Sequence, residues 1–204
     1  MVDHHRKVII WDVDETLCHS YFDIPLPQKL NANDDRFYEF KLYDGNEPSR
    51  WQNVWGTTRR YAKDVIRELD ARGFIQIVWS AGEYEYVHNM VKVLFYSIGV
   101  RPLTVLTRDD CDRTPGPNSH TVKDLRKLWN KYPHLMNHRN TIIIDNRQDV
   151  CLYNLNSHIL VPDYEPPASS PFVDDECLKK IFMHVIDYMF VDDIRKITSV
   201  KITS

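Results

Sequence analysis

The sequence predicts an α/β domain in which helices flank a central parallel β-sheet and a small β insertion follows the first strand. Short apolar runs rich in β-branched residues, such as VIIW (8–11) and TIIID (141–145), are typical of buried strands. Segments with apolar residues at helical spacing lie between such runs, and this alternation indicates a parallel sheet covered on both faces. A proline-rich stretch (21–57) interrupts the pattern soon after the first strand and indicates an insertion.

The insertion is predicted to contain strands rather than helices. Its three prolines and the turn signal YDGN (43–46) do not suit a long helix. Before that turn, Tyr38, Phe40 and Leu42 alternate with polar residues, so one side of an extended segment is apolar. We therefore expect one arm of a hairpin or of a small sheet, with one face half-buried.

Helices and strands alternate over the rest of the chain. After the insertion, Val65, Ile66 and Leu69 fall on one helical stripe, and Gly73 supplies a C-terminal stop. The same reasoning along the sequence predicts a helix over 57–73, a strand over 74–79, a helix over 83–99, a strand over 104–107, a helix from about Thr121, strands over 141–145 and 158–162, and a final helix near 175–190.

Polar residues gather where these strands end. The carboxyl ends of parallel strands meet at one edge of a sheet, and sites in such folds lie beyond that edge. A lysine near the start of the helix that precedes strand 141–145 adds a cation to the group. The residues concerned are Asp12, Asp14, Thr16, Ser80, Arg108, Lys123, Asp145 and Asn146.

This set of side chains predicts a site for a divalent cation and a phosphate. Two aspartates in a place that excludes water repel each other, and a bound cation offsets that repulsion. Mg²⁺ prefers oxygen ligands and keeps several waters. Asp12, the backbone carbonyl of Asp14, and either Asn146 or Asp145 are positioned along the chain to supply those oxygens.

The same residues suggest a reaction on a phosphate ester. Attack by Asp12 forms an acyl phosphate that water hydrolyses. Asp14 is suited to protonate the leaving oxygen and later to deprotonate the water. Lys123 and the cation offset the negative charge of the two reactants. Ser80 and backbone N–H groups after Asp12 are suited to bind the phosphoryl oxygens.

Four motifs resemble those of a known superfamily. DVDETL, WSAG, VKDLRKL and IIIDN occur in the order seen in the haloacid-dehalogenase superfamily. The segments VIIWDVDETLCHS, TVKDLRKL, TIIIDNRQDVCLYNLNSHILVPDY and VDDIRKI resemble, more narrowly, the small phosphatases that act on the C-terminal domain of RNA polymerase II, the nuclear LIM interactor-interacting factor-like family. The resemblance covers nearly the whole chain and is weakest over 21–57.

The resemblance implies a Rossmann-like haloacid-dehalogenase fold and a role for each matching residue. Asp12 matches the phosphorylated nucleophile, and Asp14 matches the general acid–base that also offers a backbone oxygen to Mg²⁺. Asn146, in the pair with Asp145, matches the direct metal ligand. The remaining matches are to substrate-binding positions, namely Thr16, Ser80, Ala81, Arg108 and Lys123, of which Lys123 also matches the motif-three lysine.

Two motifs depart from the family pattern. WSAG replaces the usual FTAS, so a serine hydroxyl replaces that of threonine, and we expect activity to be retained. DNRQ replaces the usual DNSP and places Arg147 and Gln148 beside the metal ligand, where they bear on substrate choice.

The expected function is a Mg²⁺-dependent phosphoserine/threonine protein phosphatase that works through an aspartyl-phosphate. Its expected partner is a phosphoprotein or phosphopeptide, the RNA polymerase II C-terminal domain among the candidates. Two alternatives stay open: a catalytically weak phosphopeptide-binding module on the same fold, and a phosphatase that acts on phosphotyrosine or small metabolites. Comparing such substrates with a phosphoserine peptide separates them.

Composition excludes several other classes. A net charge of −3 gives no support to a sequence-independent nucleic-acid binder, which needs a basic excess. No apolar run reaches the ~18 residues that a membrane span requires. The apolar run near the N-terminus is too short for a signal peptide. We therefore expect one domain over residues 1–204, nuclear or cytoplasmic, that is a monomer or a weak oligomer.

Overall fold

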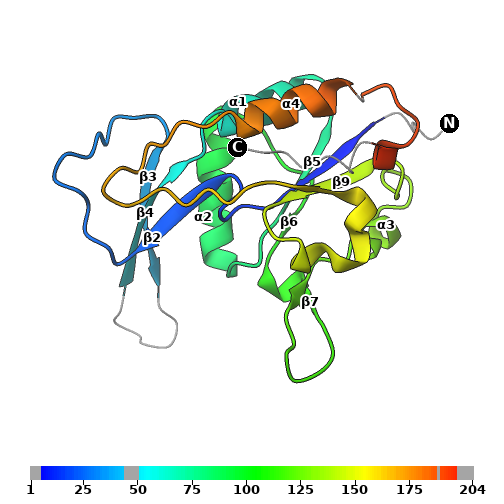
Figure 1. Ribbon diagram of the computed structural model, residues 1–204, viewed down its shortest axis with the longest axis horizontal. Helices are drawn as coiled ribbons and strands as arrows, with labels where there is room; N and C mark the ends of the chain where they lie inside the picture. The colour runs from blue at the N-terminus through cyan, green and yellow to red at the C-terminus, as the bar shows by residue number, and fades with distance from the viewer. Residues whose placement is uncertain (1–5, 44–50, 188, 197–204) are drawn as a thin grey trace.

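The computed structural model describes residues 6–43, 51–187 and 189–196. Five parallel strands form the main sheet in the order β10-β9-β1-β5-β6, and helices flank it (Figure 1). The fold class predicted from the sequence is therefore confirmed. The strands are β1 (Val8–Trp11), β2 (Cys18–Phe22), β3 (Phe37–Tyr43), β4 (Trp51–Thr58), β5 (Ile75–Trp79), β6 (Val105–Leu106), β7 (Asp112–Arg113), β8 (Thr121–Val122), β9 (Thr141–Asp145) and β10 (His158–Leu160). The α-helices are α1 (Ala62–Ala71), α2 (Tyr84–Leu94), α3 (Arg126–Lys131) and α4 (Cys177–Asp187).

The main sheet is buried on both faces. Ile9 and Trp11 of β1 pack with apolar residues of α1, α2 and α4, whereas Val8 and Ile10 pack on the other face with residues of α3. All four side chains are fully inaccessible to solvent. Because successive side chains of a strand point to opposite faces, this one short strand contributes to both cores. That double burial explains why the strand reads as an unbroken apolar run.

The predicted β insertion is present as a three-stranded antiparallel sheet in the order β2-β4-β3, beside the main sheet (Figure 1). Its strands begin at Cys18 and end at Thr58, slightly beyond the predicted bounds of 21–57. Tyr38 and the partly buried Phe40 and Leu42 pack against the main core, as the alternation predicted. Most of the predicted turn at 43–46 lies outside the described residues.

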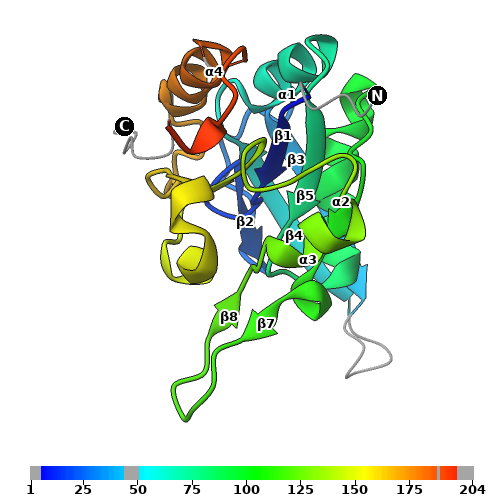
Figure 2. The same cartoon turned by 90° about the vertical axis from the view of Figure 1, so that its right-hand side faces the viewer.

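The predicted helix from about Thr121 is wrong in its first part. Thr121 and Val122 form β8, which pairs with β7 in a hairpin that extends from the body of the molecule (Figure 2), and α3 begins only at Arg126. The four residues from Val122 to Leu125 are all buried. A helix with one exposed face does not bury four successive side chains, so the helix begins only after them.

The last helix is shorter than predicted, since α4 covers Cys177–Asp187 rather than 175–190. Asp175 accepts a hydrogen bond from the backbone N–H of Cys177 (3.0 Å) and caps its start. Tyr188 lies outside the described residues. None of the helices in the described ranges combines the length and the apolar character needed to cross a membrane.

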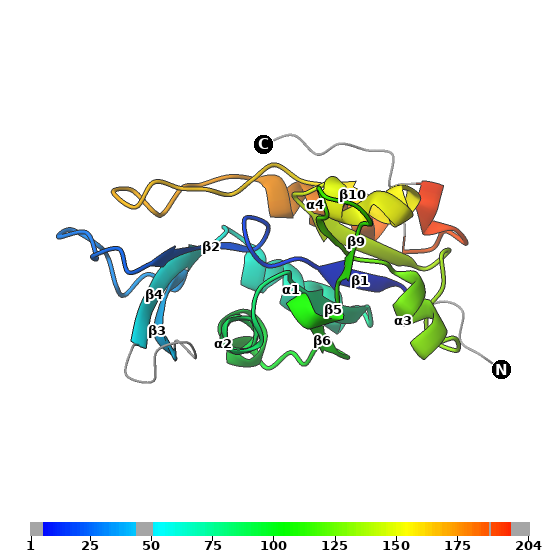
Figure 3. The same ribbon diagram turned by 90° about the horizontal axis from the view of Figure 1, so that it is seen from below.

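An extended segment, residues 161–176, runs alongside the insertion; we call it the strap (Figure 3). Its Tyr164 N–H donates to the carbonyl of Glu15 (2.7 Å), and its Pro171 carbonyl accepts from the hydroxyl of Thr57 (2.8 Å). These bonds join the strap both to the loop after β1 and to β4. The strap therefore fastens the insertion to the main domain.

Arg59 is the buried centre of this attachment. Its guanidinium donates to Asp175 (2.9 Å) and to the carbonyls of Pro162 (2.9 Å) and Thr16 (3.4 Å). Only 1% of its side chain is exposed. A buried charge satisfied by several acceptors is expensive to remove, because its partners lose their donors.

We predict that Arg59→Met lowers the free energy of unfolding by about 3 kcal/mol, because Asp175 is left with its charge poorly compensated. The neighbouring Arg60, whose side chain is 40% exposed, is a matched control. Arg60→Met should change the free energy by less than about 1 kcal/mol. Urea unfolding followed by tryptophan fluorescence measures both, and equal effects of the two changes would refute the role given to Arg59.

Candidate active site

The register of the main sheet brings the predicted site residues to one edge. Trp11, the last residue of β1, is paired with Val78 of β5 and with Ile144 of β9. The three strands therefore end side by side. Asp12 follows β1, Ser80 follows β5 and Asp145 closes β9. This convergence is what the sequence predicted for the carboxyl ends of parallel strands.

Lys123 lies between two of these carboxylates. Its Nζ donates to Asp12 Oδ1 at 2.6 Å and to Asp145 Oδ2 at 2.7 Å. All three side chains are buried. Burial alone would lower the pKa of Lys123, but the charges of Asp12 and Asp145 outweigh burial and raise the pKa above its ordinary value.

Lys123 compensates the charge of Asp12 only in part. Burial, together with the negative charge of Asp145, raises the pKa of Asp12 to about 6, although Lys123 opposes the shift. One lysine thus faces two carboxylates, and the buried group carries a net negative charge when all three are ionised. Such a group favours a further cation nearby.

The backbone around Lys123 holds the side chain in this position. Its N–H donates to the carbonyl of Val150 (2.7 Å), and its carbonyl accepts from the Nδ2 of Asn154 (2.6 Å). Both polar groups of this buried peptide segment are therefore paired within the protein. The irregular backbone between β8 and α3, rather than a helix, presents the lysine to Asp12.

Asp14 lies in a tight turn after β1. The N–H groups of Leu17 and Cys18 both donate to the carbonyl of Val13 (2.9 and 3.2 Å), and Glu15 has a positive φ of 56°. The turn directs the Asp14 carboxylate towards α2 and the end of β5 rather than into solvent. Ser80 Oγ donates to its Oδ2 at 3.0 Å.

The hydroxyl of Tyr86, on α2, donates to the other carboxylate oxygen of Asp14. Burial, followed by the charge of Asp12, raises the pKa of Asp14 to about 6, whereas the two hydroxyl donors oppose that rise. A carboxyl group with a pKa near 6 is protonated in part of the molecules near neutral pH. It can therefore donate a proton in one step and accept a proton in the next.

Asp145 and Asn146 are adjacent in the sequence but have different hydrogen-bond partners. Both oxygens of Asp145 accept hydrogen bonds, one from Lys123 and the other from the N–H of Arg147 (2.8 Å). The Asn146 amide oxygen accepts from the hydroxyl of Thr16 (3.2 Å), and its Nδ2 donates to Asp163 (2.8 Å). The amide is thereby oriented with its oxygen towards the turn that carries Asp12 and Asp14.

Ala81 and Arg108 lie at a cavity of about 440 Å³ next to Asp14. Arg108 donates to the carbonyl of Ala81 (2.9 Å) and to Glu83 (3.1 Å), and 58% of its side chain is exposed. It therefore stands at the cavity mouth and is not bonded to the aspartates. The insertion forms a further wall of this cavity through Phe22, Leu42 and Gln52.

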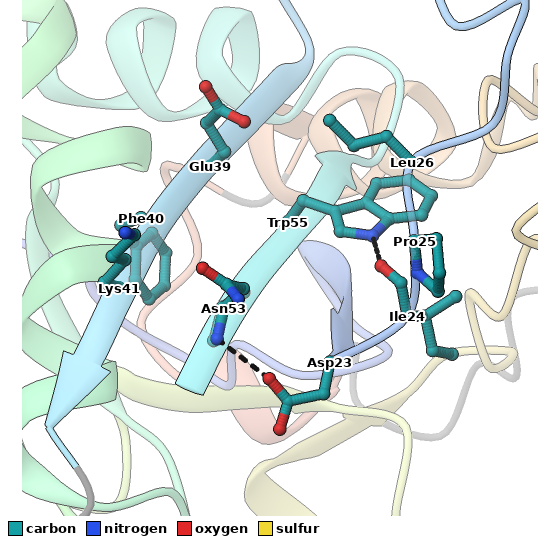
Figure 4. Close-up of a pocket in the computed structure, with 10 residues that line it drawn as sticks. Asp23, Ile24, Pro25, Leu26, Glu39, Phe40, Lys41, Asn53 and Trp55 are labelled. Carbon is teal, nitrogen blue, oxygen red and sulfur yellow. Dashed lines mark hydrogen bonds between the residues drawn. The ribbon is translucent and has the colours of Figure 1, made fainter. Parts of the chain in front are cut away.

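A second pocket, of about 580 Å³, lies on the insertion (Figure 4). Trp55 Nε1 donates to the carbonyl of Ile24 (2.6 Å), and the N–H of Asn53 donates to Asp23 (3.0 Å), so both bonds fasten the loop after β2 to β4. Its described lining includes none of the predicted site residues. We therefore assign the chemistry to the strand ends.

Two functional candidates were missed from the sequence, Tyr86 and Asp163. Tyr86 lies four residues before Met90, so it falls on the buried stripe of its helix, and a buried tyrosine hydroxyl requires a polar partner. That signal was readable in the sequence. Asp163 gave no such signal, because only the course of the strap brings it to Asn146.

We predict that Lys123→Met lowers the free energy of unfolding by about 3 kcal/mol near neutral pH, because two buried carboxylates then face each other without a cation. Lys127→Met is the control, since 47% of that side chain is exposed, and its effect should stay below about 1 kcal/mol. Urea titration of both variants provides the measurement. An unchanged stability for Lys123→Met would contradict the charge balance described here.

Similar folds occur among solved structures. The structure of Fcp1, an essential RNA polymerase II CTD phosphatase, matches 80% of this chain with a TM-score of 0.61 and 21% identity, and the match covers 43% of that chain. A variant of the fission yeast RNA polymerase II CTD phosphatase Fcp1, bound to beryllium fluoride, matches 92% of this chain with a TM-score of 0.62 and 20% identity, covering 51% of that chain. This chain thus spans about half the length of those two structures.

An uncharacterized protein from Listeria monocytogenes serotype 4b matches 91% of this chain with a TM-score of 0.50 and 12% identity, covering 99% of its own length. At these identities the likenesses show the fold alone. No curated protein matches the sequence. Residues 7–195 match the model of the NLI interacting factor-like phosphatases, and the chain belongs to that family.

Proposed function

We propose that this protein is a Mg²⁺-dependent phosphoserine/threonine protein phosphatase that works through an aspartyl-phosphate at Asp12. The observation that carries the proposal is the buried Lys123 between Asp12 and Asp145, with Asp14 two residues further along the chain. Membership of a phosphatase family supports the reaction class. The protein specificity, the metal and the intermediate are our inference.

The oxygen donors at the strand ends suit Mg²⁺. Within the described ranges, no three histidine, cysteine, aspartate or glutamate side chains form a metal-binding group. A site here would therefore combine the carboxylate of Asp12 with the backbone carbonyl of Asp14, an amide oxygen and waters, which is typical of Mg²⁺. We propose Asn146 rather than Asp145 as the side chain from the last pair, because both oxygens of Asp145 accept bonds from the protein. The ion, when bound, would offset the negative charge of the phosphate and of the nucleophile.

The protein's own residues account for the rest of the reaction. A carboxylate oxygen of Asp12 attacks phosphorus, and Lys123 reduces the repulsion between the two anions. Asp14 gives its proton to the leaving oxygen and then takes a proton from the water that hydrolyses the intermediate. Ser80 Oγ, which donates to Asp14 in this structure, and the N–H groups of the turn after Asp12 are the donors that we assign to the phosphoryl oxygens.

A phosphorylated protein segment is the substrate that we favour. The insertion contributes Phe22, Leu42 and Gln52 to the cavity beside Asp14, so a ligand there meets more than a phosphate site. Two structures of similar fold belong to the RNA polymerase II CTD phosphatase Fcp1, which supports that phosphoprotein domain as one candidate. A nuclear or cytoplasmic location and a monomeric or weakly oligomeric state remain predictions from the sequence.

We predict that the purified chain releases phosphate from p-nitrophenyl phosphate in the presence of Mg²⁺, and that removal of the metal by a chelator stops the reaction. Asp12→Asn should abolish turnover, because an amide cannot act as the nucleophile. The same variant should lose the ability to retain beryllium fluoride, which mimics the phosphoryl group. Asp64→Asn, an exposed carboxylate on α1, is the control and should keep full activity. Sustained hydrolysis by Asp12→Asn would refute the assignment of the nucleophile.

We also predict that a phosphoserine peptide is hydrolysed with a higher kcat/KM than a phosphotyrosine peptide or a sugar phosphate. The reason is the additional contact area that the insertion provides beside Asp14. Phosphate release from the three substrates under the same conditions is the measurement. A preference for phosphotyrosine or sugar phosphate would favour the alternative enzymes, whereas binding of the phosphoserine peptide without turnover would favour a binding module.

A further inference from the structure

A chain of hydroxyl groups connects Asp14 to the insertion sheet. Tyr86 of α2 donates to Asp14 and is also bonded to Ser20 Oγ of β2 (2.8 Å). Ser20 Oγ is bonded in turn to the hydroxyl of Tyr38 on β3 (2.7 Å). The Tyr38 hydroxyl donates to the carbonyl of His19 (3.0 Å). Three separate elements therefore support one side of the Asp14 carboxylate.

The protein encloses this series of hydrogen-bonded hydroxyl groups tightly. Tyr86 and Tyr38 are each only 5% exposed. On β4, an added Cβ at Gly56 would lie 2.5 Å from the Tyr38 hydroxyl and 2.1 Å from the carbonyl of His19. Only glycine leaves space at that position, so three strands converge tightly on the far end of the chain. The hydroxyl groups cannot move far without displacing the insertion sheet.

The hydrogen bonds of this series depend on the protonation of Asp14. The carbonyl of His19 only accepts, which fixes the direction of the Tyr38 hydroxyl. While Tyr38 donates to His19, Ser20 must donate to Tyr38, and Tyr86 must donate to Ser20. All four bonds therefore hold a proton when Asp14 is a carboxylic acid that donates to Tyr86. When Asp14 is a carboxylate that accepts from Tyr86, the three hydroxyl protons fill only three of the four bonds.

We propose that Tyr86, held by Ser20, is a positioning residue that aims the Asp14 carboxyl group at the leaving oxygen of the substrate. This proposal rests on the phosphatase function proposed above and goes beyond it, because it assigns the insertion sheet a part in proton transfer. Tyr86 exchanges no proton with the substrate. It fixes the orientation of the group that does.

The reaction identifies the step that depends on this orientation. An Asp12 oxygen forms a bond to phosphorus while the ester P–O bond breaks, and the electron pair of that bond stays on the leaving oxygen. The leaving oxygen takes the proton of Asp14. A water later gives its proton to Asp14 and attacks phosphorus, which releases Asp12. The breaking of the P–O bond depends on the basicity of the leaving group, and a proton delivered by Asp14 weakens that dependence.

Leaving groups can therefore separate a positioning role from a structural one. p-Nitrophenolate departs readily without a proton, whereas an alkoxide such as the oxygen of serine requires one. A loss of general-acid positioning slows the alkyl ester and spares the aryl ester. Damage to the fold or to the phosphate site slows both. The quantity to compare is kcat/KM, because it reports the steps up to phosphoryl transfer and excludes the later hydrolysis.

The experiment uses the full chain with Mg²⁺ and measures kcat/KM for substituted aryl phosphates of increasing leaving-group basicity and for a simple alkyl phosphate. Tyr86→Phe should lower kcat/KM for the alkyl ester by about 10- to 100-fold, at or below the low end of general-acid contributions, because Asp14 itself is kept. The kcat/KM for p-nitrophenyl phosphate should change little. The fall of kcat/KM with increasing leaving-group basicity should therefore be steeper in the variant than in the wild type. Ser20→Ala, which keeps Tyr86 but removes its support, should cause a smaller change in the same direction.

Tyr84→Phe is the matched control. Tyr84 is on the same helix and 64% exposed, so loss of its hydroxyl should leave the dependence of kcat/KM on leaving-group basicity unchanged. An equal fall for all esters in Tyr86→Phe, or no change, would overturn the positioning role while the phosphatase function stands. If Tyr86→Phe does not fold, as judged by circular dichroism, the Ser20→Ala result decides in the same way. A wild-type chain without turnover of any ester would overturn the phosphatase proposal and this inference with it.

Discussion

The contact of Lys123 with Asp12 and Asp145 is the interaction on which the rest of the site depends. Two carboxylates cannot both be buried and ionised side by side without a cation, and the lysine supplies it within hydrogen-bond distance of each. The contact joins β1, β9 and the segment before α3 at one point. It also leaves a net negative charge in this buried group when all three side chains are ionised.

Neighbouring residues at this edge have separate tasks because strand geometry directs them apart. Asp145 is the last residue of β9 and turns inwards to Lys123, whereas Asn146 follows the strand and faces the turn after β1. Asp14 is directed by its own turn towards α2, away from Lys123. Three acids close in space therefore differ in partner, which gives each of them a different electrostatic environment.

The insertion lines the cavity and also supports the Asp14 side chain. It is fastened to the main domain by the strap and by the buried Arg59, and its hydroxyl groups extend to Asp14. Gly82 completes this side of the site. An added Cβ there would lie 3.0 Å from the ring of Tyr86 and 3.1 Å from Ser80 Oγ, so the glycine of WSAG leaves room for both donors to Asp14. The departure from the usual FTAS motif thus has a steric consequence.

The sequence by itself determined the parallel sheet, the β insertion and the strand ends where Asp12, Ser80 and Asp145 gather, because apolar periodicity and the position of residues along a strand are local properties. It did not determine the irregular path through Lys123, since burial of successive residues depends on what packs around them. Tyr86, Asp163 and the strap reached their partners only through contacts between segments distant along the chain. Local pattern predicts elements, and tertiary packing decides which side chains meet.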